Sequence, residues 1–245
     1  SKLVKNYDIE KIIITWDVSK KTFRNDIYQD YKANRSSSPE NFKIQIKELQ
    51  NLLTKFNLPQ VSLEGFEADD VLGSLSNYFN KQNKKVTIVT GDRDSFQLIS
   101  SKTKIMYTKR GISDVEIYDS EAFKEKYQIS TKQYVEYLAL KGDKSDNIPG
   151  LPGVGEKTAI SLLQKYKNIT NIYKNLNNLT PKLQSNFLDN KDILLMSKDL
   201  AMIKTDLDLH VPSTKLNETV FFDKQILEQS KKDISKYELS RFLGE

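Results

Sequence analysis

Apolar residues in the first half of the chain alternate between short buried runs and positions spaced as on one face of a helix. The runs "KIIIT" (Lys11–Thr15) and "KVTIVT" (Lys85–Thr90) predict buried strands, because β-branched residues dominate them. Weaker runs predict strands at Val61–Leu63 and Lys104–Thr108, and helical spacing predicts helices at Phe42–Phe56, Ala68–Asn80 and Ser95–Ile99. This alternation predicts an α/β fold, with a mostly parallel sheet flanked by helices.

The pattern changes near residue 120, after which no strong strand pattern returns. The helices predicted there are Thr131–Leu140, Lys157–Tyr166, Lys182–Leu188, Lys191–Leu200 and Asp223–Lys231. The first two are separated by "KGDKSDNIPGLPGVGE", whose glycines and prolines mark a tight turn rather than a flexible joint. We therefore expect an α/β domain over residues 1–120 and an all-helical region over residues 121–245 that folds against it.

One segment of the α/β part fits neither pattern. Residues 19–38 ("SKKTFRNDIYQDYKANRSSS") are polar and basic, with Phe23, Tyr28 and Tyr31 among the charges. The segment has helical capacity but a poor core face. We therefore expect it to protrude near the end of the first strand and to be mobile or ordered by a partner.

Composition narrows the chemistry that the chain can carry out. Cysteine is absent, which excludes disulfides, thiolate catalysis and cysteine-ligated metal sites. The one histidine, His210, has no serine or carboxylate constellation around it, so histidine-based hydrolysis lacks its usual residue. A net charge of +5 and a pI near 9.0 fit a polyanionic partner, although a Lys-, Asn- and Ile-rich composition gives this signal little weight alone. No apolar run is long enough for a membrane helix and no signal-peptide pattern is present, so we expect a cytoplasmic protein.

Acidic residues stand in four groups where the predicted elements begin or end. The groups are Asp17, then Glu67, Asp69 and Asp70, then Asp92 and Asp94, then Asp143 and Asp146. Each group alone has an ordinary explanation as a helix cap or a polar turn. Together they differ, because ligand sites in open α/β sheets form at the carboxyl ends of strands, and converging carboxylates repel unless cations lie between them. All-oxygen ligands select hard ions, so we predict a site for two or more Mg²⁺ or Mn²⁺ ions that clamp a scissile phosphate.

In this order, the acidic groups and the motifs around them resemble the 5′-nuclease family: the 5′→3′ exonuclease domain of bacterial DNA polymerase I, phage 5′ nucleases and flap endonucleases. The resemblance runs through "FRNDIYQDYKANR", "EGFEADDVLG", "VTIVTGDRDSFQLI", "YLALKGDKSDNIPGLPGVGEKTA" and "DLAMIKTDL". It implies a PIN-like 5′-nuclease core followed by a helical DNA-binding region. The activity it implies is that of a structure-specific 5′→3′ exonuclease or flap endonuclease, which uses two metal ions in primer removal and repair.

The resemblance also implies a role for each acidic group. The first metal site would use Glu67, Asp69 and Asp70 with support from Asp17, and the second would use Asp94, Asp143 and Asp146, with Asp92 between the sites. Arg93 stands in "TGDRD" where Lys is usual in the family. We expect this change to matter little.

The basic segment would form the helical arch through which a single 5′ strand threads. Lys32 would contact the scissile phosphate, while Arg24 and Arg35 would stabilise developing charge. From the residues alone, a solvated basic loop is the favoured explanation of the same segment.

Residues 150–158 ("GLPGVGEKT") resemble the turn of the helix–turn–helix (H3TH) element, here at about residues 131–166, that grips duplex DNA in this family and often binds K⁺. Glycines let a backbone approach phosphates closely, and amides at a helix N-terminus attract anions. The implied DNA contacts are Lys141, Lys144, Gly150, Gly153, Gly155, Lys157 and Thr158. A tight turn between helices is the ordinary explanation.

The family pattern also includes a strand ending in an Asp, in a motif like "DGN", upstream of "KIIITWD", and the sequence starts at Ser1 inside that region. Taken literally, this would impair the first metal site, so a non-catalytic DNA-junction binder is the main alternative to the nuclease. A metal-dependent phosphatase is a more remote one. The expected partner is DNA with a 5′ flap or 5′ end at a duplex junction. An RNA primer and DNA polymerase I, as partner or parent polypeptide, are further implied partners, and we expect a monomer.

Overall fold

The computed structural model describes residues 9–36, 38–109, 111 and 113–211. Within them the strands form two small sheets. In the first, β1 (Ile14–Thr15) pairs in parallel with β2 (Gln60–Val61). In the second, β3 (Val86–Thr90) is parallel to β4 (Thr103–Thr108), which is antiparallel to β5 (Val115–Tyr118). The predicted mostly parallel arrangement is confirmed, although the first two strands are shorter than their apolar runs and β5 was not predicted.

The second sheet buries β-branched side chains of two neighbouring strands. Along β4, Ile105 is fully buried, and along β3 the buried Ile88 alternates with the exposed Val89. Parallel pairing sets Ile88 directly opposite Ile105. Two β-branched residues therefore pack side by side in the core at this register.

The α/β part contains three helices and one 3₁₀ turn, η1 (Asp94–Leu98), within the described residues. The helices are α2 (Phe23–Ile27), α3 (Glu40–Lys55) and α4 (Ala68–Lys81). Helix α4 contacts both sheets and begins with a reciprocal capping box between Glu67 and Asp70. Two residues that the sequence marked as metal ligands therefore also fix the start of this helix.

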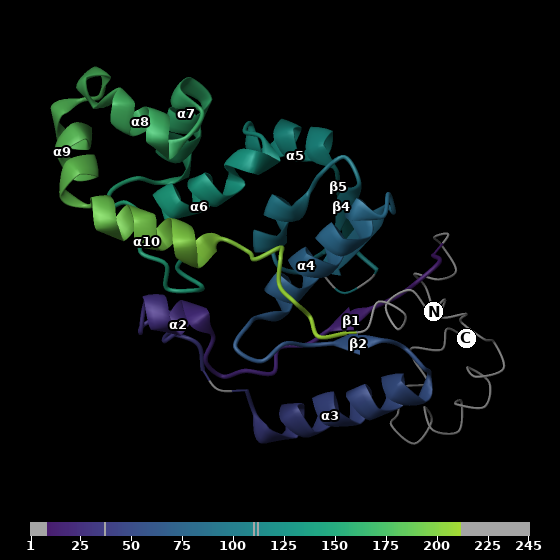
Figure 1. Ribbon diagram of the computed structural model, residues 1–245. Helices are drawn as coiled ribbons and strands as arrows, with labels where there is room; N and C mark the ends of the chain where they lie inside the picture. Colours follow the sequence, from purple (N-terminus) through teal and green to yellow (C-terminus); the bar gives the residue numbers. More distant parts are fainter. Residues whose placement is uncertain (1–8, 37, 110, 112, 212–245) are drawn as a thin grey trace.

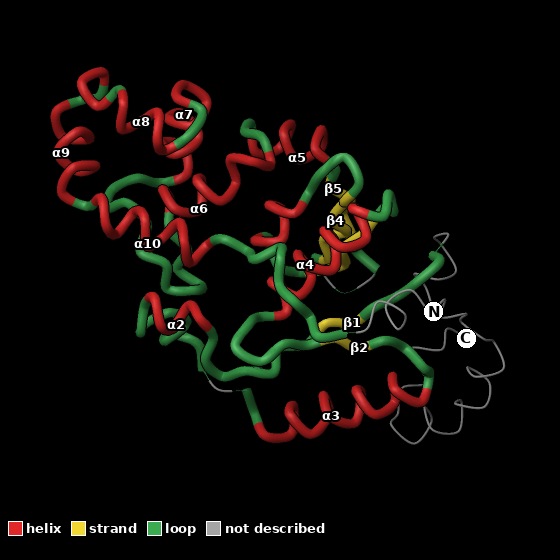
Figure 2. Tube along the Cα trace, in the orientation of Figure 1, coloured by secondary structure: helices red, strands yellow, loops and turns green. Residues whose placement is uncertain are grey.

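After β5 the described chain is helical, as the sequence predicted. The elements are α5 (Ser120–Tyr127), η2 (Thr131–Gln133), α6 (Tyr134–Lys141), α7 (Glu156–Tyr166), α8 (Ile169–Lys174), η3 (Leu176–Asn178), α9 (Pro181–Asp189) and α10 (Lys191–Ala201). Helices α5 and α8 were not predicted, and the helix predicted at Asp223–Lys231 lies outside the described residues. Figures 1 and 2 show α7, α8 and α9 gathered at one end of the molecule, away from α3 and the short strands β1 and β2.

One core joins the second sheet to the helical region. Phe96 in η1 packs edge-on against Phe123 of α5 and Tyr134 of α6, with ring centroids 5.8 and 5.9 Å apart. All three rings are nearly or fully buried. The turn that carries Asp94 is therefore packed directly against the first helices of the helical region, because burying aromatic surface favours this contact.

The expectation that residues 19–38 protrude is wrong for Arg24 and Tyr31, although most of the other described residues of the segment are exposed. Arg24 in α2 is 2% exposed and Tyr31 is 5% exposed. The sequence suggested a poor core face because the buried groups are polar. Buried carboxylates elsewhere in the chain supply the partners that make their burial favourable.

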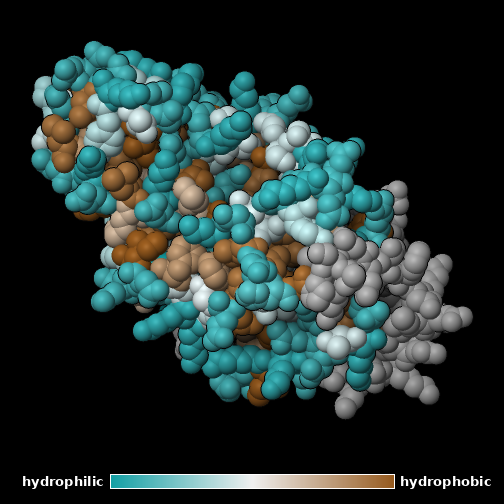
Figure 3. Space-filling view, in the orientation of Figure 1, coloured by the Kyte–Doolittle hydropathy of each residue, from teal (hydrophilic) through white to brown (hydrophobic). Residues whose placement is uncertain are grey.

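The face drawn in Figure 3 is mainly hydrophilic, with separate hydrophobic patches. Within the part of the chain that the structure describes, no helix is both long enough and apolar enough to cross a membrane.

Candidate active site

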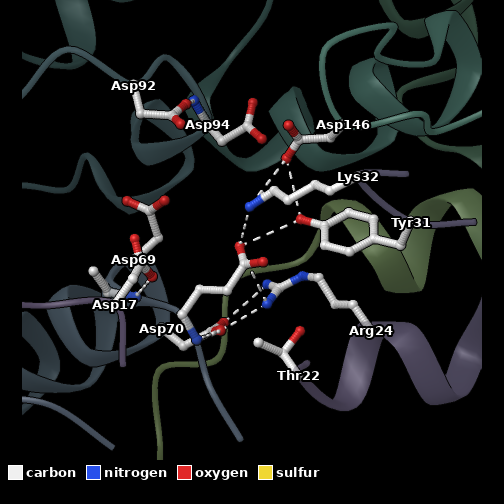
Figure 4. A network of polar contacts seen from close by, with 12 residues as sticks. Asp17, Thr22, Arg24, Tyr31, Lys32, Asp69, Asp70, Asp92, Asp94 and Asp146 are labelled. Atoms are coloured by element: carbon white, nitrogen blue, oxygen red, sulfur yellow. Dashed lines mark hydrogen bonds and ion pairs between the residues drawn. The ribbon is translucent and has the colours of Figure 1, made fainter. Parts of the chain in front are cut away.

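The acidic groups found in the sequence come from four places in the fold. Asp17 follows β1, Glu67 to Asp70 begin α4, Asp92 and Asp94 follow β3, and Asp143 and Asp146 lie in the loop between α6 and α7. Figure 4 shows members of all four groups facing a common space. The predicted convergence at the carboxyl ends of β1 and β3 therefore holds in this structure.

Two of these carboxyl groups are protonated more readily than usual. Burial, together with the charge of Asp92, raises the pKa of Asp69 to about 7, although a hydrogen bond donated by the Ser95 hydroxyl opposes the shift. Burial also raises the pKa of Asp94 to about 8, with further contributions from Asp92, Asp143 and Asp146. Such shifts are expected where like charges converge without a compensating cation.

This donor set suits a hard divalent ion, although the coordination shell is not closed. Among the described residues, no three acidic or histidine side chains are arranged tightly enough to hold a metal ion as they stand. Mg²⁺ keeps several of its waters and usually takes only one or two protein carboxylates together with substrate phosphates. An open arrangement of oxygen ligands around half-buried Asp69 and Asp94 therefore fits such an ion.

Asp70 occupies a different environment from the other acidic residues. It is 0% exposed, and its two oxygens accept bonds from both terminal nitrogens of Arg24, at 2.7 and 2.9 Å. The same oxygens accept the backbone N–H groups of Glu67 and Lys204. The interpretation of Asp70 as a metal ligand is therefore not supported by this arrangement, because its accepting positions are already used inside the protein.

Arg24 likewise differs from the expectation that it faces the substrate. Besides Asp70, its guanidinium donates to the carbonyl oxygens of Leu200 and Met202, each at 2.8 Å. Its side chain is 3% exposed. In this structure Arg24 ties α2, the start of α4 and the segment after α10 together, rather than pointing into the open site.

Lys32 and Arg35 do reach the acidic cluster. The Lys32 ammonium lies 2.7 Å from Glu67 Oε2 and 3.6 Å from Asp146 Oδ2, and its side chain remains 24% exposed (Figure 4). Arg35 is ion-paired with Asp146 and also donates to the carbonyl oxygen of Ser145. These two cations lie beside the carboxylates of the cluster, and their contact with a scissile phosphate stays a prediction.

Tyr31 is a site residue that the sequence reasoning did not select. Its hydroxyl bonds to Asp146 at 3.1 Å and to Glu67 at 3.3 Å. Burial, with the charges of these carboxylates, raises the pKa of Tyr31 far above its usual value. The sequence signal was its place among the aromatic residues of the basic segment, which does not distinguish it from Tyr28.

The basic segment and the loop after α6 are joined by one backbone hydrogen bond and by two that asparagine side chains donate to backbone carbonyl oxygens. The Lys32 N–H donates to the Asp146 carbonyl oxygen at 3.0 Å, and Asn147 donates to the Asp30 carbonyl oxygen at 2.7 Å. Asn34 donates to the carbonyl oxygen of Lys144.

Beside this contact lies a polar pocket of about 240 Å³, whose lining includes Asp17 and Glu67. Asp17 also accepts the Ala68 N–H at 2.7 Å and so caps α4.

The three glycines predicted to contact DNA have different environments. A Cβ on Gly150 would lie 2.3 Å from the Gly142 nitrogen, and the buried Gly150 N–H donates to the Ser197 hydroxyl. Gly150 is therefore needed for backbone packing, and its prediction as a phosphate contact is not supported. Gly153 and Gly155 are exposed, and a Cβ on either would meet nothing within 4 Å.

The predicted lysine contacts and Thr158 surround this turn. Gly155 is the N-cap of α7, and Lys157 and Thr158 are exposed in its first turn. Lys144 is exposed in the preceding loop, whereas the partly buried Lys141 places its ammonium 5.1 Å from the centre of the Tyr137 ring. An open helix N-terminus with nearby cations can bind an anion.

Both parts of the chain match known protein families. Residues 1–128 match the 5′-3′ exonuclease N-terminal resolvase-like domain, and residues 129–222 match the 5′-3′ exonuclease C-terminal SAM fold. A 5′-3′ exonuclease of Buchnera aphidicola is 39% identical over 211 residues, covering 83% of this chain and 72% of the relative. DNA polymerase I of Bacillus subtilis is 36% identical over 92% of this chain, which spans 26% of that polymerase.

Solved structures agree with this at the level of the fold. T5 5′-exonuclease with bound divalent metal ions (zinc) superposes with a TM-score of 0.68 at 21% identity, covering 96% of this chain and 87% of that one. The catalytic core of Rad2 in complex with DNA substrate superposes with a TM-score of 0.53 at 20% identity, covering 88% and 76%. Since both exonuclease domains match in their expected order over residues 1–222, the chain belongs to the 5′-3′ exonuclease family.

Proposed function

We propose that this chain hydrolyses DNA phosphodiester bonds near a 5′ end or at the base of a 5′ flap, with Mg²⁺ or Mn²⁺ as cofactor. The observation that carries the proposal is the convergence of carboxylates on the space that Lys32 and Arg35 enter. A divalent ion and a phosphate are the two ligands that such a mixed site of anions and cations can hold together. The relatives named 5′-3′ exonuclease support the same activity.

The residues best placed to hold divalent ions are Asp69, Asp92 and Asp94, with Glu67, Asp143 and Asp146 around them. Asp17 lies at the edge of the site, where it caps α4. A bound ion would supply Lewis-acid stabilisation of the charge on the phosphate oxygens. T5 5′-exonuclease with bound divalent metal ions (zinc), and a T5 flap endonuclease pseudo-enzyme-product complex with DNA and metal ions, support a divalent ion as cofactor.

The chain's own residues supply the remaining electrostatics. Lys32 and Arg35 would hold positive charge beside the scissile phosphate, because their ion pairs with Glu67 and Asp146 keep both cations at the site. Preorganised donors of this kind are each commonly worth about 3–4 kcal/mol of transition-state stabilisation. Arg24 contributes by holding α2 in place rather than by contact with the substrate.

The helical region would bind the duplex part of the substrate. The exposed Gly153 and Gly155, with the first turn of α7, offer backbone amides to phosphates, and Lys157 adds a charge there. Contacts to phosphates give affinity without sequence specificity. K⁺ binding at this turn remains a prediction.

The biological setting extends the same proposal. The likeness to DNA polymerase I supports a role in replication primer removal and repair, either beside that polymerase or as part of it. Action on an RNA primer, a monomeric state and a cytoplasmic location remain predictions of the same interpretation.

The test is cleavage of a 5′-labelled DNA flap by the purified chain in Mg²⁺, beside a binding titration in Ca²⁺. We expect cuts near the junction that EDTA abolishes and that Asp94→Asn reduces at least about a hundredfold, since a ligand at the reacting phosphate is lost. Glu125→Gln, an exposed change on α5, serves as the control and should cut like the parent. Tight flap binding without cleavage by the parent would instead support the non-catalytic junction binder.

A further inference from the structure

The segment that follows α10 lies closely along α4. Residues 200–207, here called the strap, comprise the last two residues of α10 and the segment that continues beside α4 (Figure 1). A Cβ on Gly73 would lie 2.7 Å from the Lys204 carbonyl oxygen, so only glycine allows this approach. Ser74 accepts the Leu207 N–H, and Asn77 donates to the Thr205 carbonyl oxygen at 2.7 Å. The strap is therefore fixed to the helix that begins with Glu67.

Gln97 connects the strap to the turn that carries Asp94. Its side-chain nitrogen donates to the Asp94 and Ala201 carbonyl oxygens, each at 3.0 Å, and its oxygen accepts the Ile203 N–H at 2.9 Å. The amide can satisfy two carbonyls and one N–H in one orientation only, so its placement is unambiguous. Each polar atom of the side chain is thus used to join η1 to the strap.

This contact bears on the reactive site through the backbone of Asp94. The η1 turn is short, and a 3₁₀ turn has poorer hydrogen-bond geometry than an α-helix. A side-chain donor to the Asp94 carbonyl oxygen restricts the backbone that sets where the Asp94 carboxylate points. The strap in turn continues from α10, which packs against α6, so Gln97 links that turn to the helical region as well.

We propose that Gln97 is a positioning residue that holds the Asp94 carboxylate in the metal site by clamping η1 to the strap. The proposal rests on the proposed nuclease function. Gln97 touches no reacting group itself. It acts on the part of the backbone from which a candidate ligand projects, and the loss of partners that orient metal ligands typically costs 10–100-fold in metal affinity or activity.

The test uses Gln97→Met, which has a similar length but no hydrogen bonds, and Gln97→Glu, which keeps the acceptor for Ile203 but sets an oxygen against two carbonyls. The readouts are kcat and KM on the flap, and the Mn²⁺ affinity of the DNA-free protein measured calorimetrically. We expect kcat and Mn²⁺ affinity each to fall about 10–100-fold, with KM for DNA changed less than about threefold.

The matched control is Asn80→Leu, which removes a side-chain hydrogen bond between the far end of α4 and Thr103. It should lower stability by about 1 kcal/mol while leaving kcat and Mn²⁺ affinity unchanged. Thermal unfolding of every variant fixes a temperature at which all are folded. If Gln97→Glu, folded at that temperature, matches the parent in kcat and Mn²⁺ affinity, the positioning role is overturned even though the parent cuts. A parent that fails to cut in Mg²⁺ overturns the proposed function, and the role of Gln97 with it.

Discussion

The Arg24→Met substitution tests the interpretation of Arg24 and Asp70 as a structural pair. Methionine roughly fills the volume of the arginine stem but leaves the Asp70 carboxylate buried without its partner. Both side chains are almost fully inaccessible, at 3% and 0%, and they share two short bonds. The carbonyl oxygens of Leu200 and Met202 lose their donors as well.

The expected loss follows from this burial. Removing one partner of a buried ion pair typically costs about 3–5 kcal/mol, because an uncompensated charge remains in a medium of low polarity. Folded domains are stable by only about 5–15 kcal/mol, so Arg24→Met should remove a large part of the stability. Adding Asp70→Asn to Arg24→Met should restore part of the loss, because the buried charge is then gone.

Urea unfolding followed by circular dichroism measures these free energies from the midpoint and slope of each curve. Lys43→Met breaks an exposed pair with Glu40 and serves as the control, with an expected cost below about 1 kcal/mol. If Arg24→Met costs no more than Lys43→Met, the pair is not the anchor described above. Additive losses in the double variant would likewise contradict direct coupling.

Three further predictions follow from the geometry. Gly150→Ala should destabilise the chain by roughly 2–5 kcal/mol in urea unfolding, because φ is +66° and the added Cβ would meet the Gly142 backbone at 2.3 Å. Gly153→Ala should cost only about 1–2 kcal/mol, because only its positive φ is unfavourable, and equal losses would refute the packing role of Gly150. Without metal, the free energy of unfolding should fall as the pH rises toward and through about 7–8, because folded Asp69 and Asp94 hold protons that the unfolded chain has already released. Added Mg²⁺ should weaken this dependence, and pH-independent urea midpoints in EDTA would contradict the prediction. Lys32→Met should tighten Mn²⁺ binding to the DNA-free protein about three- to tenfold in calorimetry, because the substitution removes a cation that competes with Mn²⁺ for Glu67, and it should lower kcat. Weaker Mn²⁺ binding would show that Lys32 does not compete with the ion.

The strands and helices with strong periodicity could be predicted from the sequence. The run "KVTIVT" and the spacing after Ala68 each gave an element within a residue or two of its ends. The weaker elements β5 and α5 could not be predicted in this way. Strand β5 depends on its pairing with β4, and α5 depends on the contact of its Phe123 with Phe96, so partners in other elements decide both.

The acidic groups show what sequence order can and cannot decide. Their positions after strands and at helix starts predicted that they converge at one sheet edge. In the structure β1 and β3 belong to different sheets, and Asp143 and Asp146 come from a loop between helices, so tertiary packing brings the groups together. The separate roles of Asp69 and Asp70 were not visible, although the two residues are adjacent. On α4 they point in different directions, so Asp69 meets the open cluster and Asp70 meets Arg24.

The sequence by itself therefore determined the fold class and the family, and it predicted a metal cofactor, since these inferences depend on periodicity, composition and the order of motifs. Only the tertiary structure decided which charges face each other. Arg24, Tyr31, Gly150 and Gln97 obtain their roles from partners that lie from 3 to 176 positions away along the chain. Such contacts depend on the directions of side chains in a packed core, which local residue patterns do not specify.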